Sequence, residues 1–213
     1  MELKQLSNQI YYNLKLSQYG KEKEFITKCF QNHLENQFYT VKLRLHVIDS
    51  LYSTQMNKRY YGIEELAESI AQYSDEILIE EAQKVLIGKY SEILEALFSN
   101  KYGYNSIAQK QKKAVSLISK YLYFLTDYQF PIYDSLVKIA YPKVILQYNL
   151  KTEYLKITDA NFLKALSHLN EVSGINNFEK LDNYLWYSQK VANKSYSLIY
   201  SKEDHLSMIR IKN

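Results

Sequence analysis

Lys120 and Asp134 are the two side chains in this sequence whose types and surroundings are typical of a reactive site. Lys120 lies in an apolar stretch that predicts a helix, and an amine there is a possible nucleophile. Pro131 fixes its own φ and disfavours helical geometry in the residue before it, so we expect that helix to end before the proline. Asp134 can then cap the next helix by accepting a hydrogen bond from the amide of Leu136 or Val137. A structural interpretation also fits, in which Asp134 is only a cap and Lys120 only a solvated charge.

The low glycine and proline content predicts a helical protein. The 213 residues include 5 glycines and 2 prolines, which is too few for many hairpins and tight turns. Long helices joined by short polar loops fit this composition, and apolar residues recur at helical spacing from the first helix onward. We therefore expect an all-α protein that forms one continuous helical body over residues 1–213, without internal repeats.

Capping residues and glycines predict where individual helices begin and end. Gly20 is expected to separate a first helix from a second at about residues 21–37, and a third is expected at about 39–53. Further helix starts are predicted at Ser74-Asp75, Thr158-Asp159 and Asn176-Asn177. Residues 100–105 are expected to form a loop, and residues 196–213 fit either short strands or a frayed helix.

The charge pattern permits nucleic-acid binding without requiring it. The chain has 27 lysines and arginines against 23 acids, a small excess. The densest basic run consists of Lys101, Lys110, Lys112, Lys113 and Lys120. Lysines beside the amides of a helix start could hold a DNA phosphate, although a solvated helix face has the same composition.

Cysteine and histidine usage argues against metal and disulfide chemistry. The single Cys29 excludes an internal disulfide and a cysteine-based metal site, and the four histidines lack metal-ligand spacing. We expect neither a metal nor another cofactor. The first residues lack the apolar run of a signal peptide and no stretch is long and apolar enough for a membrane span, so a cytoplasmic location is expected.

Three segments resemble DNA glycosylases. Leu51-Tyr52-Ser53-Thr54-Gln55 resembles the Leu-x-Ser-x-Gln element of endonuclease III-like helix-hairpin-helix DNA glycosylases. Ser119-Lys120-Tyr121, followed by Phe130-Pro131-Ile132-Tyr133-Asp134-Ser135, is similar to a pattern found in a group of bacterial 8-oxoguanine-glycosylase-like proteins. The ending Leu181-Asp182-x-x-Leu185-Trp186 also resembles that group. The order of these elements agrees over residues 42–186.

The resemblance implies a two-lobed helical body with a cleft between the lobes, and a reaction on duplex DNA with a flipped nucleotide. Lys120 would attack C1′ of that nucleotide, which requires a neutral amine. Asp134 would stabilise the positive charge that develops on the sugar as the base leaves. Gln55 would fill the gap left by the flipped base or contact the orphaned partner.

The resemblance also implies further site residues. Asn57 and Ser119 are expected to contact DNA together with Gln55, and Tyr121, Tyr133 and Trp186 are possible stacking surfaces for the base, with core packing as the alternative. The family's glycine-rich hairpin is absent, since Val115–Ser119 takes its place, and the aspartate follows the lysine by only 14 positions. Contacts to phosphates are therefore expected from Lys110, Lys112 and Lys113, unless they are lost together with the activity.

Three functions follow from this sequence. The first is a DNA N-glycosylase, with or without AP-lyase activity, that removes a damaged or modified base during DNA repair. The second is a catalytically inactive DNA-binding or defence-associated protein with a glycosylase fold. The third is a helical interaction or toxin-type protein that acts without DNA. Neither the recognised base nor the oligomeric state follows from the residues.

Overall fold

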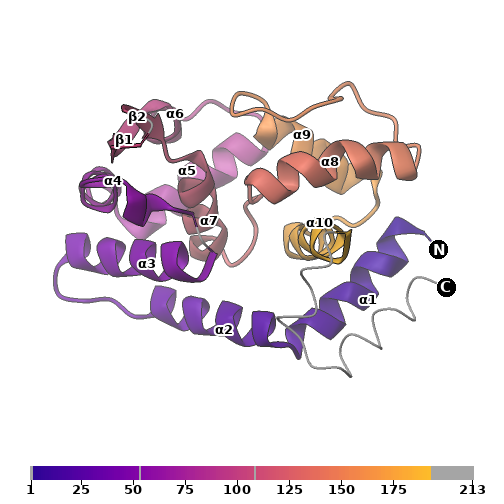
Figure 1. Ribbon diagram of the computed structural model, residues 1–213, viewed down its shortest axis with the longest axis horizontal. Helices are drawn as coiled ribbons and strands as arrows, with labels where there is room; N and C mark the ends of the chain where they lie inside the picture. The colour runs from indigo at the N-terminus through magenta and orange to yellow at the C-terminus, as the bar shows by residue number, and fades with distance from the viewer. Residues whose placement is uncertain (1, 53, 108, 193–213) are drawn as a thin grey trace. The chain divides into compact units, whose positions relative to one another are not determined.

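The computed structural model describes residues 2–52, 54–107 and 109–192, and these are mostly helical (Figure 1). They form ten α-helices, the short 3₁₀ helix η1 and one two-stranded hairpin. The elements are α1 (Leu3–Lys15), α2 (Gln18–Gln31), α3 (Gln37–Tyr52), η1 (Met56–Lys58), α4 (Gly62–Ile70), α5 (Asp75–Leu86), α6 (Glu92–Ser99), β1 (Lys101–Asn105), β2 (Lys110–Lys113), α7 (Val115–Leu125), α8 (Ser135–Gln147), α9 (Phe162–Val172) and α10 (Phe178–Ala192). The prediction of a helical protein is confirmed, but the hairpin was not predicted. None of these helices is long and apolar enough to cross a membrane.

The chain forms two compact units, each with its own core. Unit 1 combines Met1–Glu24 with Pro131–Asn213, and unit 2 is the continuous segment Phe25–Phe130. The first boundary falls within α2, and the second falls just before Pro131.

Helix α7 is the centre of unit 2. It packs against α3, α5 and α6, and its buried residues are Val115 and the whole run from Leu117 to Phe124. A helix that is apolar on nearly every side must be surrounded by other elements, which explains this position. Lys120 lies within that buried run and is one of its few polar residues.

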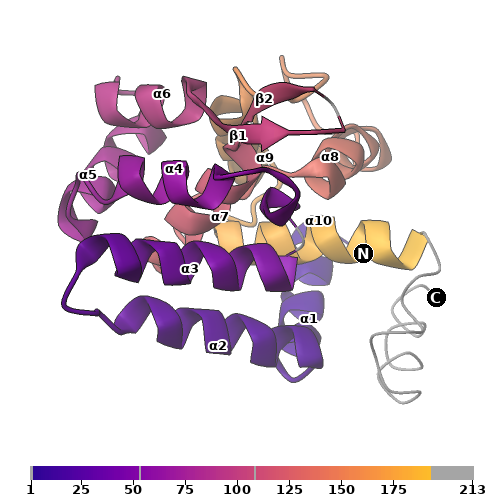
Figure 2. The same cartoon turned by 60° about the vertical axis from the view of Figure 1, so that its left-hand side comes forward.

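The hairpin joins α6 to α7 in unit 2 (Figure 2). Its strands are antiparallel, and Gly103 forms a bulge between the paired positions of Tyr102 and Tyr104. Gly103 has φ +66°, and a Cβ there would lie 2.5 Å from the Cα of Gly62, so only glycine fits. The prediction of a loop at residues 100–105 was wrong. The strand β1 is stabilised by contacts with α4 and by an isolated bridge between Tyr60 and Tyr104. These partners are distant in sequence, so a local pattern does not reveal them.

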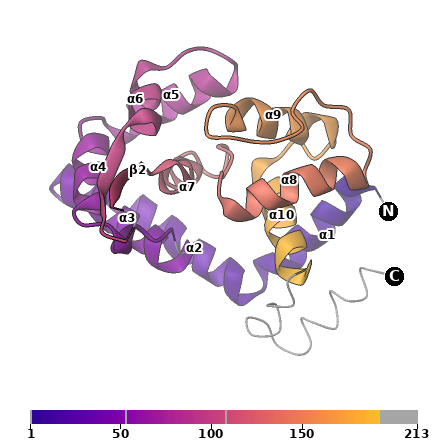
Figure 3. The ribbon, with the colours of Figure 1, turned by 45° about the horizontal axis from the view of Figure 1, so that its top comes forward.

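Unit 1 is organised around α10. Both α1 and α8 pack against it, as Figure 3 shows for α8. Leu181 and Leu185 of α10 are buried, in agreement with their helical spacing.

Several predicted helix boundaries require correction. Gly20 lies inside α2 rather than between two helices. A Cβ at Gly20 would lie 2.3 Å from the carbonyl oxygen of Lys15, so this glycine permits a close approach to the end of α1. The second helix ends at Gln31, earlier than the predicted residue 37. The next helix already begins at Gln37, and Asn36 caps it by accepting a hydrogen bond from the Phe38 amide at 2.9 Å. The residue before α9 is Asn161, so the predicted start at Thr158-Asp159 came three residues too early.

Other boundaries agree with the prediction. Ser74 caps α5 by accepting from the Ile77 amide, and Asn177 accepts from the Lys180 amide at 2.8 Å at the start of α10. The alternatives for residues 196–213 lie outside the described residues.

Candidate nucleic-acid interface

Lys120 is buried in the middle of α7. The residue is 2% exposed, and its Nζ donates a 3.4 Å hydrogen bond to Oγ of Ser116, one turn earlier in the helix. The same Nζ lies 5.3 Å from the centre of the Tyr52 ring, at the end of α3. Two of the segments that resemble glycosylases, around Leu51–Gln55 and around Lys120, therefore meet within unit 2.

The loop after α3 is held in place by a buried carboxylate. Oδ1 of Asp49 accepts hydrogen bonds from the Thr54 hydroxyl and, at 2.8 Å, from the Met56 amide. Between these two residues, Gln55 is exposed and has the left-handed φ of +61°. A glutamine in this conformation is strained and needs support from its surroundings. Asp49 thus fixes the loop that presents Gln55, a role that sequence analysis missed.

Two other predicted DNA contacts lie close to this loop or to Lys120. Asn57 lies in η1, directly after the loop, and Ser53 lies outside the described residues. Ser119 is fully buried, and its Oγ donates to the carbonyl oxygen of Ser116 at 3.0 Å.

The predicted phosphate-binding lysines lie on the hairpin. Lys110, Lys112 and Lys113 belong to β2, and all four residues of this strand are exposed. Lys113 is paired directly with Lys101 of β1, an arrangement of like charges that is unfavourable in the free protein and that an anion would relieve. None of the ion pairs within the described ranges involves these four lysines, whereas Lys42 is paired with Glu64 and Lys138 with Asp159.

Arg59 attaches the hairpin to the segment before α4. Its Nη1 donates to the carbonyl oxygens of Lys112 and Lys113, each at 3.1 Å. Burial lowers the pKa of Arg59, and the charge of Asp49 opposes this shift. On β1, the amide of Gly103 donates to Oε2 of Glu65 at 2.6 Å. The hairpin is thus fixed at its base to the rest of unit 2.

Exposed tyrosines accompany the lysines. Tyr60 and Tyr104 are joined by two backbone hydrogen bonds of 3.0 and 3.1 Å, and they are 64% and 45% exposed. Tyr61 is 74% exposed and has φ +58°. We call the following exposed side chains the hairpin surface: Lys58, Tyr60, Tyr61, Lys101, Tyr104, Lys110, Lys112 and Lys113.

The two stretches that contribute to the hairpin surface contain no acid. Residues 50–63 and 96–126 together hold seven lysines and arginines and neither aspartate nor glutamate. The positive charge of the chain is therefore concentrated in these stretches, and the nearest acids the structure places beside the hairpin are Glu65 and Glu68 of α4, which line a pocket together with Lys101. A basic region with interleaved aromatic side chains is typical of nucleic-acid-binding surfaces, because phosphates need cations and bases stack on rings.

Asp134 caps α8 in unit 1. Its Oδ1 accepts a 3.0 Å hydrogen bond from the amide of Val137, which confirms the predicted cap. Since Lys120 belongs to unit 2, the convergence of the two side chains on one site stays a prediction.

Tyr121 lies in the core of unit 2, next to Lys120. Its ring centre is 5.1 Å from that of Phe30, and its hydroxyl accepts a 3.3 Å hydrogen bond from Nη1 of Arg44. Arg44 is completely buried and binds both carboxylate oxygens of Asp75, at 3.0 and 2.8 Å. Burial raises the pKa of Tyr121 to about 12, and the charge of Asp75 adds to the shift. This buried network was not predicted from the sequence.

The other two predicted stacking residues lie in unit 1. Tyr133 is buried and stacked on Phe162, with 4.7 Å between the ring centres, and its hydroxyl donates to Asp159 at 2.8 Å. Trp186 is half-buried and stacked on Tyr19 at 4.5 Å. Both rings thus have aromatic neighbours within their own unit.

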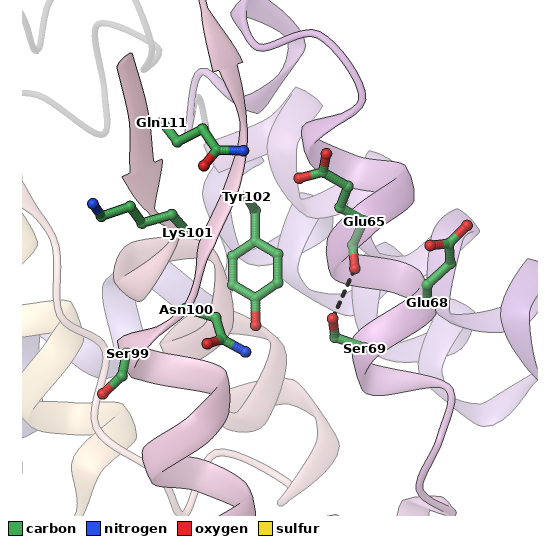
Figure 4. Close-up of a pocket in the computed structure, with 8 residues that line it drawn as sticks. All are labelled: Glu65, Glu68, Ser69, Ser99, Asn100, Lys101, Tyr102 and Gln111. Atoms are coloured by element: carbon green, nitrogen blue, oxygen red, sulfur yellow. Dashed lines mark hydrogen bonds between the residues drawn. The ribbon is translucent and has the colours of Figure 1, made fainter.

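An open pocket of about 500 Å³ lies beside the hairpin in unit 2 (Figure 4). Glu65 and Glu68 of α4 line one side, and Lys101, Tyr102 and Gln111 of the hairpin line another. Sites for small molecules are mostly apolar and enclosed, and this pocket is neither. We interpret it as a polar surface groove where α4 and the hairpin pack against each other, rather than as a site for a small molecule.

Together these features define a mostly helical protein whose unit 2 carries both a basic, tyrosine-bearing hairpin and a buried lysine. Within the described ranges, no group of three or more His, Cys, Asp or Glu side chains could hold a metal ion. No protein-family model, curated protein or solved structure matches the chain.

Proposed function

We propose that this protein binds duplex DNA through the hairpin surface of unit 2. The observation that carries the proposal is the set of hairpin lysines, which are exposed, have no acidic partner within the described ranges and include the opposed pair Lys101 and Lys113. Lysines in this state can neutralise phosphates and release counterions, which favours binding of a polyanion. Exposed tyrosines beside them offer surfaces on which an unpaired or flipped base can stack.

Fluorescence anisotropy with a labelled duplex tests this proposal directly. We expect saturable binding that weakens steeply as the salt concentration rises. If the protein fails to bind DNA even at low salt, the DNA proposal is wrong, and a helical interaction or toxin-type protein becomes the better interpretation.

We further propose that the bound DNA is the substrate of an N-glycosylase reaction, in a two-lobed body whose cleft holds a flipped nucleotide. Three observations support this. Lys120 is buried against Tyr52, the loop carrying Gln55 follows directly after Tyr52, and Asp134 caps a helix as the resemblance implies. In the reaction, the Lys120 amine forms a bond to C1′ as the glycosidic bond breaks, and the base leaves with the bonding electrons and takes up the proton that the amine releases. The C1′–O4′ bond of the sugar then breaks, O4′ takes up a proton, and the lysine nitrogen and C1′ form a protonated imine. Asp134 stabilises the positive charge on the sugar.

Borohydride trapping tests the covalent step, because it reduces the imine between a lysine and the sugar to a stable amine. We expect wild-type protein to crosslink to a duplex with an abasic site or a damaged base, such as 8-oxoguanine. Lys120→Met replaces the amine by an unbranched apolar side chain that is one atom shorter, and it should abolish the crosslink. Circular dichroism confirms that the variant is folded.

Asp134→Asn is the matched variant for the carboxylate. Asparagine also caps helices well, so the stability should change little while base release falls. Undiminished base release by this variant would remove Asp134 from the mechanism.

An inactive DNA-binding protein is the second candidate, and one observation favours it. The Lys120 amine already donates a hydrogen bond within its own helix and is 2% exposed, as a structural lysine would be. This candidate predicts that Lys120→Met binds DNA like wild type and that neither protein releases a base or forms a crosslink.

A further inference from the structure

The turn of the hairpin carries an exposed isoleucine. Ile107 lies between β1 and β2 and is 88% exposed, more than any other large hydrophobic residue in the described part of the chain. Its neighbours in the turn, Ser106 and Gln109, are polar and exposed. A large apolar side chain at this position gains nothing from the folded structure, because it remains in water.

The base of the hairpin is hydrogen-bonded to the segment before α4, so the turn extends from an anchored base. Arg59 binds the carbonyl oxygens of Lys112 and Lys113, and the backbones of Tyr60 and Tyr104 are joined by two hydrogen bonds. This anchoring matters because ordering a mobile loop on binding costs free energy, which would reduce the affinity gained when a side chain enters the nucleic acid.

We propose that Ile107 is a wedge that enters a groove of duplex DNA and separates neighbouring base pairs. This inference rests on the proposed DNA-binding function and assigns the turn a role within it. Lys110 and Lys112, on the strand after the turn, would bind phosphates along the groove and place Ile107 at its floor. Proteins that kink DNA use apolar side chains such as isoleucine in this way, between contacts to the backbone.

The neighbours of Ile107 favour DNA over a lipid surface. An anionic membrane would also attract a basic hairpin, but stable insertion requires a continuous apolar face. In the sequence, Ile107 is the one large apolar residue between Ser106 and Gln109. Polar side chains of this kind form hydrogen bonds with base edges and sugars in a groove.

A duplex that contains 2-aminopurine tests the wedge, because this base fluoresces more strongly when it is unstacked. We expect wild-type protein to raise the fluorescence, and Ile107→Leu to do the same. Ile107→Ser should bind about tenfold more weakly, with an unchanged salt dependence, and leave the fluorescence low. Ile87→Ser is the matched control, since Ile87 is also an exposed isoleucine of unit 2, at 70%, and should behave like wild type.

Two results would overturn the wedge. One is an equal affinity and fluorescence rise with Ile107→Ser and wild type. The other is tighter binding of wild type to vesicles of equal phosphatidylserine and phosphatidylcholine than to DNA, with Ile107→Ser impaired only on the vesicles.

The failure of the wedge can be distinguished from the failure of the proposed function. If replacing Lys110 and Lys112 weakens DNA binding while Ile107→Ser changes nothing, only the wedge is wrong. If neither replacement alters DNA binding, the hairpin is not the DNA-binding surface and both proposals fail.

Discussion

Replacing the three lysines of β2 by glutamine should flatten the salt dependence of DNA binding. Lys110, Lys112 and Lys113 are exposed, and Lys113 faces Lys101 across the hairpin. Each phosphate contact contributes a slope of about 0.9 to the fall of log K with log salt concentration, so the triple variant should lose about 2.7 from this slope. Between about 50 and about 200 mM salt, wild type should lose about 40-fold more affinity than the variant.

Anisotropy titrations of one duplex at several salt concentrations measure this slope. The matched control replaces Lys151, Lys156 and Lys164, three exposed lysines of unit 1, by glutamine. This control removes the same total charge, so it should keep the wild-type slope if the effect is local to the hairpin. Equal slopes for wild type and the β2 variant, or an equal reduction in both triple variants, would refute the assignment of phosphate contacts to β2.

Three further substitutions test how the fold supports the site, each by urea denaturation followed by circular dichroism. Gly103→Ala should lower the free energy of unfolding by about 3 kcal/mol, because it combines a positive φ with a clash against backbone. Gly88→Ala is the control: Gly88 has φ +78° and open space around it, so this variant should lose only about 1 kcal/mol. Equal losses in the two variants would contradict the clash at Gly103. Gly20→Ala meets backbone oxygens without a positive φ and should cost about 2 kcal/mol, so a neutral result would show that α1 and α2 can move apart. Asp75→Ala leaves the guanidinium of Arg44 buried without its carboxylate and should cost about 3–5 kcal/mol, and a loss below about 1 kcal/mol would show that water reaches Arg44.

Local signals in the sequence account for much of the helical structure. Ser74 and Asp134 cap their helices as predicted, because an N-cap depends on one side chain and amides within three residues of it. The apolar run around Lys120 likewise predicts a buried helix on its own.

Features that depend on distant residues were missed. The hairpin forms where Tyr104 meets Tyr60 and where Gly103 approaches Gly62, and none of these contacts is visible in a local pattern. Gly20 was misread for a related reason, because a glycine that permits a close approach looks the same in a sequence as one that ends a helix.

The candidate site shows the same division. The lysines on β2 could be identified by type alone, and their exposure agrees with the role proposed for them. The supports of the site could not be found this way: Asp49 holds the loop around Gln55, and Arg59 holds the hairpin. An aspartate or arginine in a helix or loop gives no sign, in sequence, of which distant backbone it binds.

The order in which the two units are encoded has a consequence for synthesis on the ribosome. Helix α1 packs on α10, which begins at Phe178, whereas every segment of unit 2 has been translated by Phe130. At a translation rate of about 5–20 residues per second, α10 begins to be synthesised roughly 8–30 s after α1, and until then the apolar side of α1 cannot pack against it. Unit 2 can fold during this interval, whereas the apolar side of α1 stays exposed and is a binding site for a chaperone on the nascent chain.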